Sequence, residues 1–73
     1  MKLTDGIPGV KYEIISISGQ FRNRLAELGF NPGCEIKISS KHFANYIVVN
    51  CRGSQTGLTK TETENIHIAE ILD

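Results

Sequence analysis

The chain has 73 residues, enough for one domain, and its eight basic and eight acidic side chains cancel at neutral pH. This balance disfavours binding to nucleic acids or to an anionic membrane surface, because both need a surplus of positive charge. No apolar run approaches the ~20 residues that span a bilayer, and residues 1–13 lack the apolar stretch of a secretory signal. We therefore expect a single cytoplasmic domain, residues 1–73, in which Cys34 and Cys51 remain thiols.

Glycine and proline residues open the chain, and a β-branched segment follows them. Leu3 and Ile7 are expected to fold back onto the core between turns. The residues that predict those turns are Gly6, Pro8 and Gly9. A strand is predicted over residues 10–18, because β-branched side chains favour extended backbone. Its apolar alternation changes phase between Ile14 and Ile15, which indicates either that both faces are covered or that a bulge redirects the chain.

The segment SGQFRNRLAELGFNPG predicts one short helix. The helix is expected from Phe21 to Leu28, because these two residues and Leu25 recur at helical spacing on one face. Ser18 is placed to cap its start by accepting a hydrogen bond from a free backbone N–H. The helix is thus expected to lay an apolar face on the core.

A helix stop and a tight turn follow directly. Gly29 is expected to adopt a positive φ, and Phe30 to contact Leu25 as in a Schellman motif. The next four residues, NPGC, fit a type II turn, in which Pro32 presets φ and Gly33 accepts a positive φ.

The rest of the chain predicts β structure. Cys34, Ile36 and Ile38 alternate onto one face of a strand, with polar residues on the other face. The remaining predicted elements are a strand over residues 34–41, a connector over 42–45, a strand over 46–51, a turn over 52–54, a short strand over 57–59, a helical turn over 61–65 and a last strand over 66–71. About five short strands and one helix predict a mainly β fold, a small antiparallel barrel without exposed edges.

The helix and its stop, RLAELGFNPG from Arg24 to Gly33, resemble the signature of the FeoA family, ferrous iron transport protein A. Further positions that match the family's apolar residues or glycines are Val49, Gly53, Leu58, Ile66 and Ile68. Thr63 departs from the pattern, because a small apolar residue is common there.

This resemblance implies an SH3-like barrel with a helix inserted after the first strand. It also implies an accessory role in bacterial ferrous iron uptake, with the membrane permease FeoB and its cytosolic GTP-binding domain as the partner. A similar fold forms the C-terminal domain of some iron-dependent repressors. A metal-responsive regulatory module is therefore the alternative function.

No motif in the sequence predicts an enzyme. The chain has neither a GxSxG nucleophile elbow nor a phosphate-binding glycine-rich loop with its lysine. His67 lies in an alternating strand opposite in phase to Ile66 and Ile68, and it is expected to be partly exposed. A small enzyme and a nucleic-acid-binding barrel thus rank below the accessory and regulatory functions.

The residues considered as metal ligands are Cys34, Cys51 and His42. In a hairpin centred near Phe43, the two cysteines fall opposite one another, and two thiolates can begin a soft-metal site. Free cysteines also act as small buried hydrophobes. We expect core thiols and no bound metal or other cofactor.

The expected partner-binding residues are Arg22, Arg24, Phe43 and Tyr46, since arginines and exposed aromatics are favoured at interfaces. The apolar residues of the helix segment are expected to cover the barrel instead.

Overall fold

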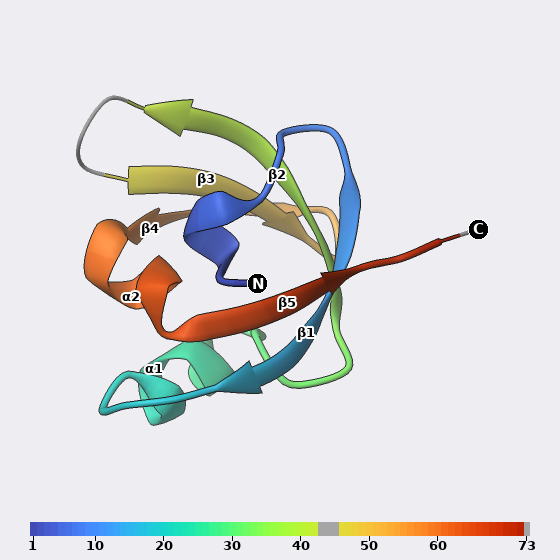
Figure 1. The fold of residues 1–73 in the computed structure, drawn as a ribbon. Helices are drawn as coiled ribbons and strands as arrows, with labels where there is room; N and C mark the ends of the chain where they lie inside the picture. The colour runs from blue at the N-terminus through green and yellow to red at the C-terminus, as the bar shows by residue number, and fades with distance from the viewer. Residues whose placement is uncertain (43–45, 73) are drawn as a thin grey trace.

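The protein is described by a computed structural model that covers residues 1–42 and 46–72, with His42 placed by its backbone only. Five antiparallel strands form one sheet in the order β4-β3-β2-β1-β5, and the sheet curls around the core (Figure 1). The elements in chain order are η1 (Leu3–Asp5), β1 (Lys11–Ile17), α1 (Arg22–Glu27), β2 (Glu35–His42), β3 (Tyr46–Cys51), β4 (Ser54–Thr59), α2 (Lys60–Glu64) and β5 (Ile66–Glu70). The predicted mainly β fold class is confirmed.

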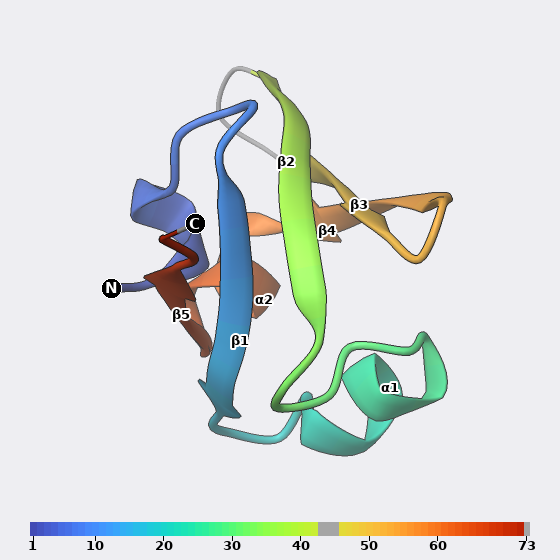
Figure 2. The same cartoon turned by 90° about the vertical axis from the view of Figure 1, so that its right-hand side faces the viewer.

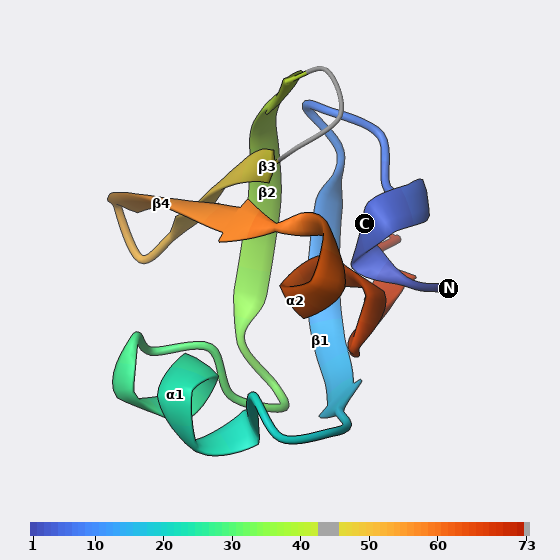
Figure 3. The ribbon, with the colours of Figure 1, turned by 90° about the vertical axis from the view of Figure 1, so that its left-hand side faces the viewer.

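The small antiparallel barrel expected from the sequence is a curled sheet (Figure 1) whose hydrogen-bonded ladder does not close among residues 1–42 and 46–72, so two terminal strands remain. Within the described residues the ladder begins at β4 and ends at β5. The helix α2 connects these two edge strands and packs against both of them, as Figure 3 shows from the side of α2. Residues at the N-terminus pair with the free side of β5, where the Ile68 N–H donates to the Met1 carbonyl oxygen at 2.7 Å.

The strand β1 lies between β2 and β5 (Figure 2). Its register against β5 shifts between Ile14 and Ser16. The predicted bulge is therefore confirmed, and the alternative of two covered faces is wrong, because the Ile15 side chain is 51% exposed. Tyr12 is fully buried, and its hydroxyl accepts a hydrogen bond from the Ile7 N–H at 2.9 Å. That bond holds the Ile7 backbone, but Ile7 is 60% exposed, so the prediction that Ile7 folds onto the core is wrong. Leu3 is buried as predicted.

The helix α1 is one residue shorter at each end than the predicted range from Phe21 to Leu28. Ser18 does not cap it. The Ser18 hydroxyl instead donates to the Asn65 carbonyl oxygen at 3.3 Å, because the chain leaving β1 runs beside the start of β5. Leu25 is fully buried, whereas Leu28 is 46% exposed, so the prediction that Leu28 faces the core is wrong.

A Schellman motif ends α1 as predicted. The Phe30 N–H donates to the Leu25 carbonyl oxygen at 2.9 Å, and the Gly29 N–H donates to the Ala26 carbonyl oxygen at 3.0 Å. Gly29 has φ +94°. The chain reverses there, and Phe30 becomes the next fully buried side chain after Leu25. Phe30 thereby fills the core position that the helical spacing had assigned to Leu28.

The turn after α1 and the following hairpin also follow the predicted pattern. The Cys34 N–H donates to the Asn31 carbonyl oxygen at 3.0 Å, and Gly33 has φ +94°, as a type II turn requires. The strands β2 and β3 then pair from Ile36 opposite Cys51 to the far end of the hairpin. The next strand, β4, has six residues and is longer than predicted, because it pairs with β3 over its whole length.

The helix α2 confirms the predicted helical turn and carries a capping box that the prediction did not include. The Thr59 side chain accepts from the Glu62 N–H, while the Glu62 carboxylate accepts from the Thr59 N–H at 2.9 Å. Thr63 is fully buried in spite of its hydroxyl. That hydroxyl donates to the Lys60 carbonyl oxygen at 2.9 Å and accepts from the Thr4 hydroxyl at 3.1 Å, so no unpaired polar group results.

Candidate functional site

An ion pair joins the two helices, which are far apart in the sequence. Arg24 on α1 lies 3.6 Å from a carboxylate oxygen of Glu62 on α2. The Arg24 side chain is 66% exposed, whereas the Glu62 side chain is only 2% exposed. One of the expected partner-binding residues therefore also contacts α2.

Glu62 is a buried carboxylate whose two oxygens have different surroundings. Oε1 accepts from the Thr59 N–H at 2.9 Å and from the Thr59 hydroxyl at 3.0 Å. Oε2 accepts no hydrogen bond within the described residues, and Arg24 is the cation beside it. Sequence reasoning missed Glu62, although Thr59 followed three residues later by a glutamate is the recognised pattern of a capping box.

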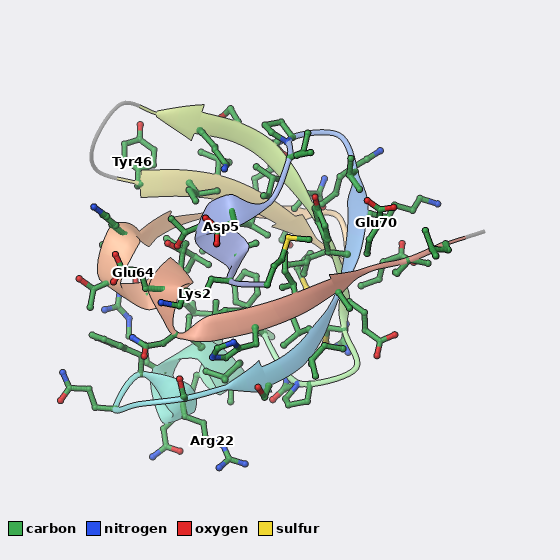
Figure 4. All side chains as sticks on the ribbon, viewed as in Figure 1. Lys2, Asp5, Arg22, Tyr46, Glu64 and Glu70 are labelled. Atoms are coloured by element: carbon green, nitrogen blue, oxygen red, sulfur yellow. The ribbon has the colours of Figure 1, made fainter. Side chains whose placement is uncertain are left out.

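The remaining expected partner-binding residues do not gather at one point. Figure 4 shows Arg22 beside α1 and Tyr46 at the start of β3, separated in this view by Glu64 of α2. Tyr46 is 43% exposed, and its ring approaches Gly57 of β4. Phe43 lies outside the described residues. Arg24 contacts α2 and Tyr46 lies on β3, a strand that packs against α2, whereas Arg22 is the first residue of α1.

The structure places Cys34 and Cys51 near the same backbone atom, but the predicted pairing is wrong by two residues, because Cys51 pairs with Ile36 and Cys34 precedes β2. Both are buried, with 8% and 6% of their surfaces exposed. Their thiols point at the same backbone atom, the Gly29 carbonyl oxygen, from 3.4 Å and 3.8 Å respectively. Arg52 Nη2, in the turn between β3 and β4, lies 3.6 Å from Cys34 Sγ. Sequence reasoning missed both Gly29 and Arg52 at this place.

The titration of the Cys51 thiol depends on its neighbours. Burial raises the pKa of the Cys51 thiol above its ordinary value, and the Cys34 side chain raises it further through charge repulsion and a hydrogen bond. The Arg52 guanidinium opposes these effects by favouring the thiolate. Cys51 is therefore held as a neutral thiol at neutral pH.

The third metal-ligand candidate is not near this pair. His42 ends β2 and pairs with Tyr46, whereas Cys51 pairs with Ile36 at the other end of the hairpin. The separation along the strand from residue 36 to residue 42 is about 20 Å at the usual rise per residue. No group of three or more His, Cys, Asp and Glu side chains that could hold a metal ion is found among the described residues. His67 is partly exposed, as predicted.

A shallow hollow lies at the strand starts beside the turn that holds Arg52. It has a volume of about 300 Å³. Its lining residues are Lys11, Glu35, Ile36, Lys37, Asn50, Arg52 and Gly53. Lys11 and Lys37 stand directly opposite each other on β1 and β2, and Glu13 and Glu35 form the next exposed pair along the same strands. The mixed charges give this face no single ligand preference.

A comparison with protein-family models tests the family resemblance carried by residues 24–33. The model of the FeoA domain matches residues 1–70. The chain belongs to the FeoA family. The FeoA family is associated with ferrous iron transport as an accessory family, and the match includes both helices and all five strands of the sheet. A search of the curated proteins finds no match.

Solved structures of FeoA proteins share the fold. Iron(II) transport protein A from Clostridium thermocellum is 31% identical with a TM-score of 0.89, covering 97% of this chain and 46% of that one. The FeoA protein from Chlorobium tepidum is 28% identical with a TM-score of 0.90, covering 99% and 71%. The Stenotrophomonas maltophilia FeoA in complex with zinc is 20% identical with a TM-score of 0.83, covering 94% and 89%. It is described as a procaryotic SH3 domain protein, which agrees with the SH3-like fold expected of this FeoA chain.

No helix within residues 1–42 and 46–72 is long and apolar enough to cross a membrane.

Proposed function

We propose that this chain is a non-enzymatic, cytoplasmic accessory protein of ferrous iron transport. It acts by binding a FeoB-type permease through the cytosolic GTP-binding domain of that permease. The observation that carries the proposal is the match of the FeoA domain model to residues 1–70. The Stenotrophomonas protein of the same fold has itself been put forward as a bacterial ferrous iron transport activating factor, which is consistent with a role of this kind.

The surface around α2 is the proposed contact. Arg24 supplies an exposed guanidinium group beside it, Arg22 supplies a second one at the start of α1, and Tyr46 supplies an exposed aromatic ring from β3. Arginine and tyrosine are enriched among the residues that dominate binding energies. A domain of this size offers an interface at or below ~1,200 Å², so we expect a transient complex of modest affinity.

The experiment is a calorimetric titration of this protein against the cytosolic domain of its permease, and then against the intact permease. Arg22→Ala and Tyr46→Ala are expected to weaken binding at least ~10-fold each, which corresponds to ~1.4 kcal/mol. Lys37→Ala is the matched control, because Lys37 is an exposed cation that lines the hollow and is not among the proposed contact residues. Its affinity and the melting temperatures of all three variants should match the wild type.

A different pair of results would contradict the proposal. If neither form of the permease binds and deleting the gene leaves ferrous iron uptake unchanged, the accessory function is wrong. The metal-responsive regulatory module would then be the function to test.

A further inference from the structure

Three electron-donating atoms converge at the end of α1 without serving the permease contact. Cys34 Sγ and Cys51 Sγ lie 3.4 Å and 3.8 Å from the Gly29 carbonyl oxygen. Thiols are weak hydrogen-bond donors. Two of them facing one carbonyl therefore gain little stability from these bonds.

The spacing fits an ion held between these atoms. Metal–sulfur bonds of about 2.3 Å and metal–oxygen bonds of about 2.1 Å place sulfur and oxygen about 3.6 Å apart at a tetrahedral angle and about 3.8 Å apart in a trigonal plane. The observed distance of 3.8 Å matches the trigonal value, and the distance of 3.4 Å is 0.2 Å shorter than the tetrahedral value. The donors therefore need little movement to coordinate a metal.

The charges nearby select the kind of ion. Arg52 Nη2 is 3.6 Å from Cys34 Sγ and remains cationic. The formal charges of two thiolates, one guanidinium and one monovalent cation sum to zero. A divalent cation would leave a net positive charge beside the two buried cysteines. Thiolate donors in low coordination number also favour soft ions such as copper(I).

We propose that Cys34, Cys51 and the Gly29 carbonyl oxygen form a binding site for copper(I). On binding, both S–H bonds break and two copper–sulfur bonds form. The two protons pass to solvent, and the oxidation state of copper does not change. The small exposed fractions of both cysteines leave a path for an ion of this size. The site is separate from the proposed permease contact, so either proposal can fail without the other.

The test is an anaerobic titration with copper(I) in competition with a chromophoric copper(I) chelator. We expect one equivalent per chain, and a loss of affinity of at least 100-fold in both Cys34→Ser and Cys51→Ser. His67→Gln is the control, because it removes a soft donor elsewhere and should leave the affinity unchanged. Circular dichroism of each variant checks the fold.

A second measurement avoids variants altogether. X-ray absorption of the copper-loaded wild-type protein should show two sulfur neighbours and one oxygen or nitrogen neighbour. Absence of a one-to-one complex, or a spectrum with a single sulfur neighbour, would overturn the proposal. Displacement of the copper by equimolar zinc(II) or iron(II) would overturn the choice of a soft monovalent ion.

Discussion

Replacing Gly29 by valine tests how the end of α1 is fixed. Gly29 has φ +94°, and a Cβ built there meets no heavy atom of the described residues within 4 Å. The cost is therefore conformational and not steric. A non-glycine residue held at positive φ loses ~1–2 kcal/mol, and β-branching brings the expected loss to ~2–3 kcal/mol. A core of this size supplies only ~3–5 kcal/mol in total.

The loss should appear as a large drop in thermal stability. For a domain of this length, each kcal/mol lowers the melting temperature by ~4–8 °C, so Gly29→Val should melt ~10–20 °C below the wild type. Thermal unfolding followed by circular dichroism, with a chelator present, measures it. The control is Ala26→Val, an exposed helical position where the substitution should cost less than ~1 kcal/mol. Equal melting temperatures for the two variants would show that the positive φ does not hold the Schellman motif together.

Three further predictions concern side chains with contrasting surroundings. Leu25→Ala should lower the free energy of unfolding in urea by ~2–5 kcal/mol, because Leu25 is fully buried. Leu28→Ala should lower it by less than ~1 kcal/mol. Similar losses in the two variants would contradict the burial argument. Glu62→Ala should cost ~1–3 kcal/mol by removing the cap of α2, and an unchanged unfolding curve would show that the capping box contributes nothing. In Cys34→Ser, the rate of Cys51 alkylation should rise at a lower pH than in the wild type, because Cys34 raises the pKa of the Cys51 thiol. A pH–rate profile that stays in place or moves to higher pH would exclude this coupling.

The local signals in the sequence predicted the fold well where neighbouring residues decide the structure. The stop at Gly29 and the turn at Gly33 depend on a few consecutive residues, and both are found as predicted. Leu28 was misplaced because helical spacing was extended beyond a helix that ends at Glu27. The exposure of Ile7 could not be predicted, since it depends on a hydrogen bond to a tyrosine whose position the tertiary fold sets.

The candidate site was less predictable for the same reason. The sequence predicted that the hairpin would bring Cys34 and Cys51 close, but the observed register places Ile36 opposite Cys51, two residues from the predicted partner. The third donor is a backbone atom of Gly29, and backbone atoms carry no sequence signal. The approach of Arg24 to Glu62 joins segments separated by about half of the chain, so neither periodicity nor turn chemistry could indicate it.

The place of β1 between β2 and β5 has a consequence for synthesis on the ribosome. Ile17 pairs with Ile66, so one side of β1 lacks its partner until nearly the whole chain has emerged. At 5–20 residues per second, this interval lasts about 3–10 s. The unpaired side of β1 is open to other extended chains during that time. We therefore expect nascent chains stalled before β5 to depend on chaperones, while completed chains do not.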